Sequence, residues 1–290
     1  MIGALVVFYL FLGGCGAGVM GATSAWSLAF HRSLDRTLGQ TRAFESLMTR
    51  CYVAGFAMLC VAALCLLLDL GRPEYAYLLF VQPTTSVLSF GSYTLLASLV
   101  VGGFLVVANL LYVPFVRARA RKIAEVVCIV ASACLMTYTG VYVACMEAVA
   151  LWNNIAIPVL FALSSASSGL SVMFIAAPFV CDWWLLDRWI ARLHRVHLVV
   201  LALELVALAA FVAAAFLSPS ASESLRLLLG GEMFGWWFLV VVVGMGVLVP
   251  LAVEALLAVS GRSLKLLPVD VLCILGGLAL RFCVIWSGTH

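Results

Sequence analysis

Charged side chains interrupt an otherwise apolar sequence at a few positions where chemistry could occur. Asp69, Arg72 and Glu74 follow directly after an apolar run, within the segment Leu-Asp-Leu-Gly-Arg-Pro-Glu at residues 68–74. Such charges cannot face lipid, because each would cost roughly 2.5–3.5 kcal/mol at the bilayer centre. The glycine and the proline of this segment end the helix, since glycine admits left-handed backbone and proline lacks an N–H donor. The segment is predicted to form a charged cap at one membrane face, and we expect it to border the functional site.

A second group of polar residues lies later in the chain. Tyr138 and Tyr142 are four residues apart and share one helix face, and Glu147 follows near the end of the same run. Tyr138 lies about nine residues, roughly 13 Å, from that end. A tyrosine at this depth needs a partner for its hydroxyl, either a neighbouring helix or a ligand. Asp69 and Glu147 are the candidate proton acceptors of such a site.

The first apolar run is rich in glycine. Gly14 and Gly18 form a G-x-x-x-G pattern, which lets two helices approach closely where lipid provides no hydrophobic driving force. Close packing of this run against the second, third and fourth spans is the simpler interpretation. A groove that admits a flat ring or an isoprenoid tail is the alternative.

Four ionisable residues fall inside apolar runs. Glu204 lies near the middle of its run, Glu254 and Asp270 lie toward the opposite face from the cap, and Arg281 lies on the side of the cap. Buried charges in a membrane pair with one another or mark an ion path. Pairing of Arg281 with Asp69 or Glu147 is one interpretation, and a proton path through the four residues is the other.

The histidines and cysteines indicate no metal centre. His194 and His197 share one helix end, so they cannot ligate a haem from two sides, and we expect them to be interfacial. The ten cysteines form no C-x-x-C pair, which is the common spacing for zinc and iron–sulfur sites. The chain is predicted to carry no haem, iron–sulfur cluster or metal ion.

These residues must be positioned by membrane-spanning helices. Charged residues make up 10% of the 290 residues and hydrophobic residues 66%, whereas soluble domains are about 25% charged. About 20 apolar residues cross the hydrocarbon core. Eight runs are long enough, at residues 2–30, 47–70, 87–113, 123–146, 153–180, 194–217, 233–260 and 264–288. The fold class predicted is therefore an all-α integral membrane protein of eight spans.

The distribution of basic residues predicts the orientation. Of the 16 Lys and Arg residues, most fall in alternate loops on one face, at positions 32, 36, 42, 50, 117, 119, 121, 122, 188, 192, 195, 262 and 265. Positively charged loops stay in the cytoplasm, so both termini and the charged cap are predicted to be external, and periplasmic in a bacterium. A net charge of +3 spread in this way indicates no nucleic-acid partner.

Several segments resemble the NrfD/polysulfide-reductase membrane-subunit family. They are Tyr-Leu-Phe-Leu-Gly-Gly at 9–14, the cap at 68–74, Tyr-Thr-Gly at 138–140, Leu-Trp-Asn at 151–153 and Leu-Gly-Gly-Leu-Ala-Leu-Arg-Phe at 275–282. The resemblance implies two four-helix bundles, residues 1–150 and 151–290, in the bacterial inner membrane. It implies electron exchange between membrane quinol or quinone (menaquinone included) and a periplasmic four-cluster ferredoxin-like iron–sulfur subunit, which contacts a molybdopterin catalytic subunit in anaerobic respiration.

The resemblance also assigns residues to a site. In the polysulfide reductase, a tyrosine on span four binds the quinone in the first bundle, and Tyr138 stands at that position. We expect Tyr142, Gly14 and Gly18 to complete the quinone site, Arg72 and Glu74 to dock the partner, and Glu204, Glu254, Asp270 and Arg281 to mark a proton path. The alternatives are a passive anchor without its own quinone site and, ranked last, a proton-translocating or transport protein.

The predicted orientation can be tested with fusions. A reporter that is active only outside the cytoplasm should be active when fused after His290 and inactive when fused near Arg119, because the basic loops remain inside. The measurement is reporter activity in whole cells, with expression of each fusion checked by immunoblot. The reverse pattern would overturn the orientation.

Overall fold

The structure, a computed structural model, describes residues 3–33, 37–69, 86–111, 118–146, 149, 151–218, 228, 234–260 and 267–287. Within these residues the chain is helical and contains no strand. The main helices are α1 (Ala4–Arg32), α2 (Leu38–Asp69), α4 (Val87–Leu110), α5 (Ala118–Ala144), α6 (Ala156–Ala176), α7 (Asp187–Leu217), η4 (Trp237–Leu248), α10 (Val249–Ser260) and α11 (Leu267–Trp286). Short helical turns are η2 (Ala177–Phe179), η3 (Trp183–Leu186) and α9 (Phe234–Trp236). Eight helices, with η4 and α10 as one of them, are long and apolar enough to cross a membrane, which confirms the predicted fold class.

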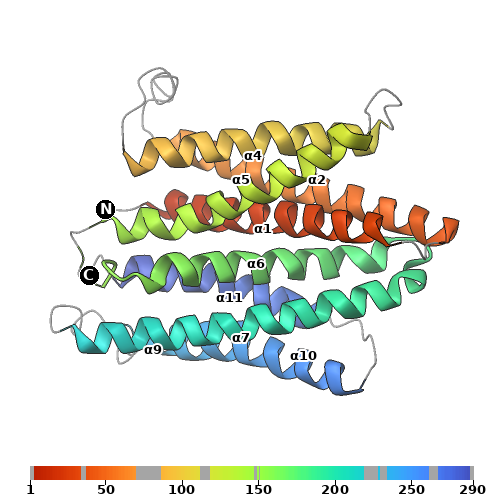
Figure 1. Cartoon of the computed structure of the whole chain (residues 1–290). Coiled ribbons are helices and arrows are strands. Elements are labelled where there is room, and N and C mark those ends of the chain that lie inside the picture. The colour runs from red at the N-terminus through yellow and green to blue at the C-terminus, as the bar shows by residue number, and fades with distance from the viewer. Residues whose placement is uncertain are drawn as a thin grey trace.

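The long helices run side by side, and both ends of the chain lie at the same end of the bundle (Figure 1). We call this the terminal end; α2 finishes there at Asp69 and α4 begins there at Val87. We call the opposite end the basic end. It carries the described basic residues of the helix termini, which are Arg32, Arg42, Arg50, Arg119, Arg121, Lys122, Arg188, Arg192 and Arg195.

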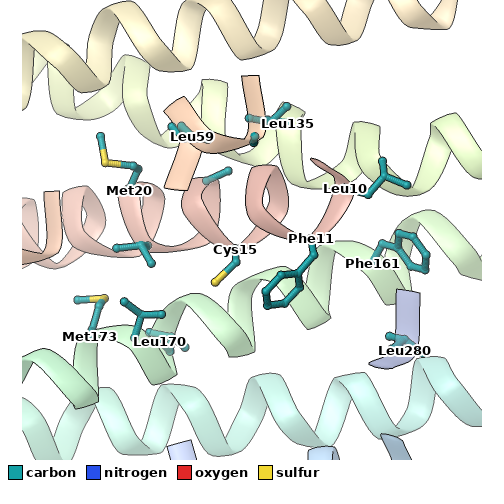
Figure 2. Close-up of a cluster of buried hydrophobic side chains, with 14 of the residues drawn as sticks. Leu10, Phe11, Cys15, Met20, Leu59, Leu135, Phe161, Leu170, Met173 and Leu280 are labelled. Carbon is teal, nitrogen blue, oxygen red and sulfur yellow. The ribbon is translucent and has the colours of Figure 1, made fainter. Parts of the chain in front are cut away.

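Helix α1 is the centre of the fold. In its most apolar stretch 78% of the residues are buried, against 28% in α2 and in α4. It packs against α2 and α5 on one side and against α6 and α11 on the other. Figure 2 shows this arrangement, with Leu59 and Leu135 on one side of α1 and Phe161 and Leu170 on the other. Both halves of the chain therefore pack against one helix.

Glycines bring α1 and α6 into backbone contact. A Cβ atom at Gly18 would overlap the carbonyl group of Ser165, and one at Gly169 would lie 2.5 Å from the carbonyl carbon of Gly18. At Gly14 a Cβ would overlap the Ser165 hydroxyl and lie 3.1 Å from Arg281. Membrane helices associate through such close packing because lipid is as apolar as their side chains. Gly14 and Gly18 thus serve close packing, but against α6, which is the fifth span, and not against the second to fourth spans as the sequence predicted.

Three helices begin earlier than hydropathy predicted, and one of them is α5, which begins at Ala118 rather than residue 123. Helix α2 begins at Leu38 rather than residue 47, and its first turn is closed by Thr37 and Gln40. The Gln40 N–H donates to Thr37 Oγ1 and the Thr37 N–H donates to Gln40 Oε1, each at 3.2 Å, which is a capping box. Helix α7 begins at Asp187 rather than 194. Hydropathy finds only the apolar part of a helix, so polar extensions beyond the membrane were missed.

The seventh span changes its helical form. Residues Trp237–Leu248 make a π-helix, η4, which continues as the α-helix α10. Its Gly246 packs on Gly276 of α11, where a Cβ would lie 2.6 Å from the neighbouring Cα. Long π-helices are rare, and sequence periodicity did not predict this one.

The division into bundles 1–150 and 151–290 stays a prediction. Helices α1, α2, α4 and α5 pack against one another, and so do α6, α7, η4, α10 and α11. However, α6 also packs directly against α1 and α5. The contact between the two halves is therefore continuous with the core of each.

The α1–α6 contact makes a prediction about stability. Gly18→Ala should lower the free energy of unfolding by about 1–3 kcal/mol, because the added methyl group forces two backbones apart. The control is Gly13→Ala on the same helix, where a Cβ meets Ala62 at an ordinary 3.7 Å. Thermal unfolding in detergent measures both. Equal stability of the two variants would contradict the close contact.

Candidate functional site

A cavity opens at the terminal end among the first four spans. Its volume is about 180 Å³, and it is lined by Val6, Tyr9, Leu66, Asp69, Leu88 and Tyr142. These residues come from α1, α2, α4 and α5. The fold therefore brings Asp69 and Tyr142, two of the residues predicted from the sequence, to one place. A cavity of about 150 Å³ is enough to hold a benzene ring.

Three phenol groups lie together here: Tyr9 and Tyr142 line the cavity, and Tyr138 contacts them without lining it. The Tyr138 and Tyr142 rings are 6.1 Å apart between centroids, and the Tyr9 phenol interacts electrostatically with both. Tyr9 and Tyr138 are almost completely buried. Neither of their hydroxyls makes a hydrogen bond of normal geometry with the described residues. An unsatisfied buried hydroxyl costs about 1–3 kcal/mol, so the pair is suited to bind a polar ligand atom.

Gly91 of α4 creates the space for Tyr138. A Cβ atom at Gly91 would overlap the Tyr138 ring at Cζ and its hydroxyl. The neighbouring Phe90 ring lies at 6.4 Å from the Tyr138 ring, between centroids. Helix α4 begins just before this contact, where Ser86 Oγ accepts a hydrogen bond from the Ser89 N–H. The start of α4 therefore fixes the position of the tyrosine on α5.

Asp69 ends α2 at the mouth of the cavity. Its side chain is exposed and lies beside the first residues of α1, with Oδ1 3.4 Å from a Cβ placed on Gly3. The N-terminus of a helix attracts negative charge. Asp69 also interacts electrostatically with Tyr142. A carboxylate in this position can receive a proton from a bound ligand and release it to water at the terminal end.

The other residues predicted for the quinone site, for proton acceptance at the terminal end and for partner docking divide into two groups. Arg72, Glu74 and Glu147 lie outside the described residues, so their roles stay predictions. Gly14 and Gly18 are described, but they contact α6 rather than the cavity. Tyr9 lines the cavity and was not predicted as a site residue.

The interpretation that Arg281 pairs with Asp69 is wrong. Arg281 is fully buried, and its guanidinium donates to Ser165 Oγ at 2.6 Å, to Gly277 O at 2.8 Å and to Phe161 O at 3.3 Å. It also lies over the rings of Phe11 and Phe161. Arg281 cannot reach Asp69 because it lies on the face of α11 that packs against α6 and α1, and not toward the end of α2.

The expectation that both α7 histidines are interfacial is also wrong for His197, which is only 1% exposed. His194 Nδ1 and His197 Nδ1 each lie 2.9 Å from Glu254 Oε1. Hydropathy placed these histidines at a helix end, but α7 begins earlier and α10 covers them. Farther along α7, Glu204 accepts a hydrogen bond from Ser167 Oγ at 2.6 Å.

One buried acid was missed entirely. Glu125 of α5 accepts a hydrogen bond from Ser27 Oγ at 2.7 Å and pairs with Arg121 at 3.4 Å, near the basic end. Its signal in the sequence is the Arg121 four residues earlier, since such pairs share a helix face. Among the described residues, no group of three His, Cys, Asp or Glu side chains is arranged to hold a metal ion. The predicted absence of haem and metal stays a prediction.

Comparison with known proteins gives two findings. A family model described as "Polysulphide reductase, NrfD" matches residues 1–290. A protein named "Protein NrfD" from Escherichia coli (strain K12) is 29% identical over 175 residues, which are 57% of this chain and 52% of that protein. The chain therefore aligns with about half the length of this relative.

The contact between Gly91 and Tyr138 can be tested directly. Gly91→Ala should displace the tyrosine ring and expose it to tetranitromethane, because the methyl group takes the space of the ring tip. The control is Gly103→Ala on the same helix, where a Cβ meets Phe56 at an ordinary 3.5 Å. Mass spectrometry should find Tyr138 nitrated only in Gly91→Ala. Equal nitration in both variants would show that the glycine does not hold the ring in place.

Proposed function

The chain belongs to the NrfD family of polysulphide reductase, whose members are membrane subunits of larger oxidoreductase complexes, and we propose that this one oxidises membrane quinol or reduces quinone. The proposed ligand site is the terminal-end cavity with Tyr9, Tyr138, Tyr142 and Asp69. Gly14 and Gly18 are left out of it because they face α6. A passive anchor without a quinone site is the alternative.

The observation that carries the proposal is the pair of buried hydroxyls of Tyr9 and Tyr138. Each lacks a hydrogen bond of normal geometry to the described residues. Tyr9 lines a cavity large enough for a ring, and Tyr138 interacts with Tyr9 and with the lining residue Tyr142. The wall of the cavity is otherwise apolar apart from Tyr142 and Asp69. A quinol head group has a flat apolar ring and two ring oxygens, so it matches an apolar cavity with a few polar groups.

In quinol oxidation each residue of the proposed site has its own role. Tyr138 and Tyr9 hold a ring oxygen by hydrogen bonds, and Asp69 accepts a proton at the cavity mouth. Each quinol gives up two protons and two electrons and leaves as quinone. The protons pass to water at the terminal end, and the electrons pass to an iron–sulfur partner docked on that end. In the reverse direction the same groups return protons to the quinone.

The partners are those that the family resemblance implies, and the predicted orientation decides the side on which they dock. Positive loops stay in the cytoplasm, so the basic end is cytoplasmic and the cavity faces the periplasm in the bacterial inner membrane. We propose that a periplasmic four-cluster ferredoxin-like iron–sulfur subunit docks at the terminal end, with Arg72 and Glu74 in the contact and Glu147 as a second proton acceptor. A molybdopterin catalytic subunit would complete the complex. In this proposal quinone or menaquinone binds to the chain as its substrate.

Removal of the Tyr138 hydroxyl distinguishes a chain with its own quinone site from a passive anchor. Tyr138→Phe should weaken quinol binding by up to about tenfold, because one hydrogen bond contributes roughly 0.5–1.5 kcal/mol. The measurement is quinol-dependent turnover of the assembled complex, compared with turnover from an artificial donor that feeds the catalytic subunit. Quinol activity should fall while the artificial activity stays.

Two controls make this result specific. Tyr52→Phe removes the hydroxyl of an equally buried tyrosine that is 3.1 Å from Ser24 Oγ on the basic half, and it should leave quinol turnover unchanged. Tyr138→Phe should also keep or raise thermal stability without ligand, since it removes an unsatisfied group. Wild-type quinol turnover in Tyr138→Phe would favour the passive anchor.

A further inference from the structure

Several buried ionisable groups lie in the second half of the chain, away from the proposed quinone site. His194 and His197 of α7 share the carboxylate of Glu254 on α10, with nitrogen–oxygen distances of 2.9 Å. Phe174 of α6 stacks on His194, with ring centroids 4.0 Å apart. Asp270 of α11 interacts electrostatically with Glu254. Three helices thus bring two imidazoles and two carboxyl groups together near the basic end, and His194 is the most exposed of the bonded groups.

Side chains that can carry protons connect this cluster to the middle of the membrane. His197 Nε2 lies 3.9 Å from Cys273 Sγ. The thiol faces the hydroxyls of Ser167 and of Ser171, and the Ser171 hydroxyl makes no hydrogen bond of normal geometry with the described residues. Ser167 Oγ then donates to Glu204 Oε2 at 2.6 Å. All of these side chains are buried. Imidazole, thiol, hydroxyl and carboxyl groups both donate and accept protons, so the series forms a relay.

The relay meets a fixed positive charge beyond Glu204. The Arg281 guanidinium interacts electrostatically with Glu204 but makes no ion pair with it among the described residues. Instead it is held by Ser164, Ser165 and the carbonyl oxygens of Phe161 and Gly277. A buried arginine in a pore raises an electrostatic barrier to protons and other cations. Arg281 therefore closes the relay on the side of the terminal end.

We propose that the residues from His194 to Glu204 form a proton-uptake path that opens at the basic end and is closed toward the terminal end by Arg281. Glu204 exchanges protons with one side of the membrane only. The path is separate from the cavity at Tyr138. In this proposal Arg281 blocks the passage of protons and does not itself carry them. The groups that face Glu204 are Ser164 and Ser167 of α6 and Cys273 and Arg281 of α11.

A simple structural role does not account for this arrangement. A carboxyl group in the membrane interior is expensive to bury, and the two serine hydroxyls that face Glu204 compensate it only in part. A structural ion pair would place Glu204 in direct contact with Arg281, whose hydrogen bonds go to serine and carbonyl oxygens instead. The shortest hydrogen bond of Glu204 goes to Ser167 of the relay, and its link to Arg281 is indirect, through Ser164.

Passive proton flux tests the barrier. The assembled complex is reconstituted into liposomes that contain a pH-sensitive dye, and flux is driven by a potassium gradient with valinomycin. Wild type should be tight, and Arg281→Gln should raise the flux about tenfold or more. The double variant Arg281→Gln with Glu204→Gln should be tight again. Arg192→Gln, which removes an exposed cation at the basic end, is the control and should stay tight. A tight Arg281→Gln complex, or a leak that persists in the double variant, would overturn the path.

A second measurement keeps the native arginine and does not depend on Arg281→Gln assembling. Infrared spectroscopy after a pH jump follows the carboxyl band that is lost in Glu204→Gln. After the pH jump this band should change about tenfold more slowly in Glu254→Gln, because that variant lacks the carboxylate that accepts protons where the path begins. An unchanged rate, or a band that does not titrate, would refute uptake through the cluster. Neither experiment uses quinol, so failure here and failure of the quinone site at Tyr138 are distinguished.

Discussion

The contact between α1 and α6 is the packing constraint on which the rest of the molecule depends. Inside a bilayer there is little hydrophobic drive to hold helices together, so their association relies on close backbone approach. Gly18 and Gly169 provide it, because a Cβ at either position would strike the opposite backbone. Helix α1 is thereby held between the two halves of the chain, with Tyr9 near one of its ends and Gly14 against Arg281. The same helix contributes to the proposed quinone site and borders the proposed proton barrier.

Two of the sets of polar groups lie toward opposite ends of the bundle. The cavity at the terminal end combines phenols with one exposed acid, which suits binding and release of a substrate that loses protons there. The histidine–carboxylate cluster near the basic end is enclosed by α6, α7, α10 and α11. Because buried polar groups are costly in lipid, each set needs a partner or a function to account for it. The two proposals assign one function to each set, and the proton relay does not reach the cavity.

Some of the site was predicted from the sequence because its residues lie at the ends of apolar runs. Tyr138 and Tyr142 share a face by their spacing, and Asp69 closes a helix, so both features follow from helical geometry. Tyr9 was not predicted to line the cavity because one tyrosine in a glycine-rich helix has no local signal for the direction it faces. Glu125 and His197 were missed for a related reason. Their burial depends on which neighbouring helix covers them, and hydropathy along one helix contains no such information.

The sequence by itself determined the class of protein, the eight spans and the family, because each depends on run length, composition and motifs along the chain. It also predicted an orientation from charge alone. Only the tertiary structure decided which faces meet: Gly14 and Gly18 against α6, Tyr138 against Gly91, and Arg281 among serines and carbonyls instead of beside Asp69. The physical reason is that every face of a membrane helix is apolar. Periodicity then does not show which face is inside, and the neighbour is selected by close packing and by hydrogen bonds between helices.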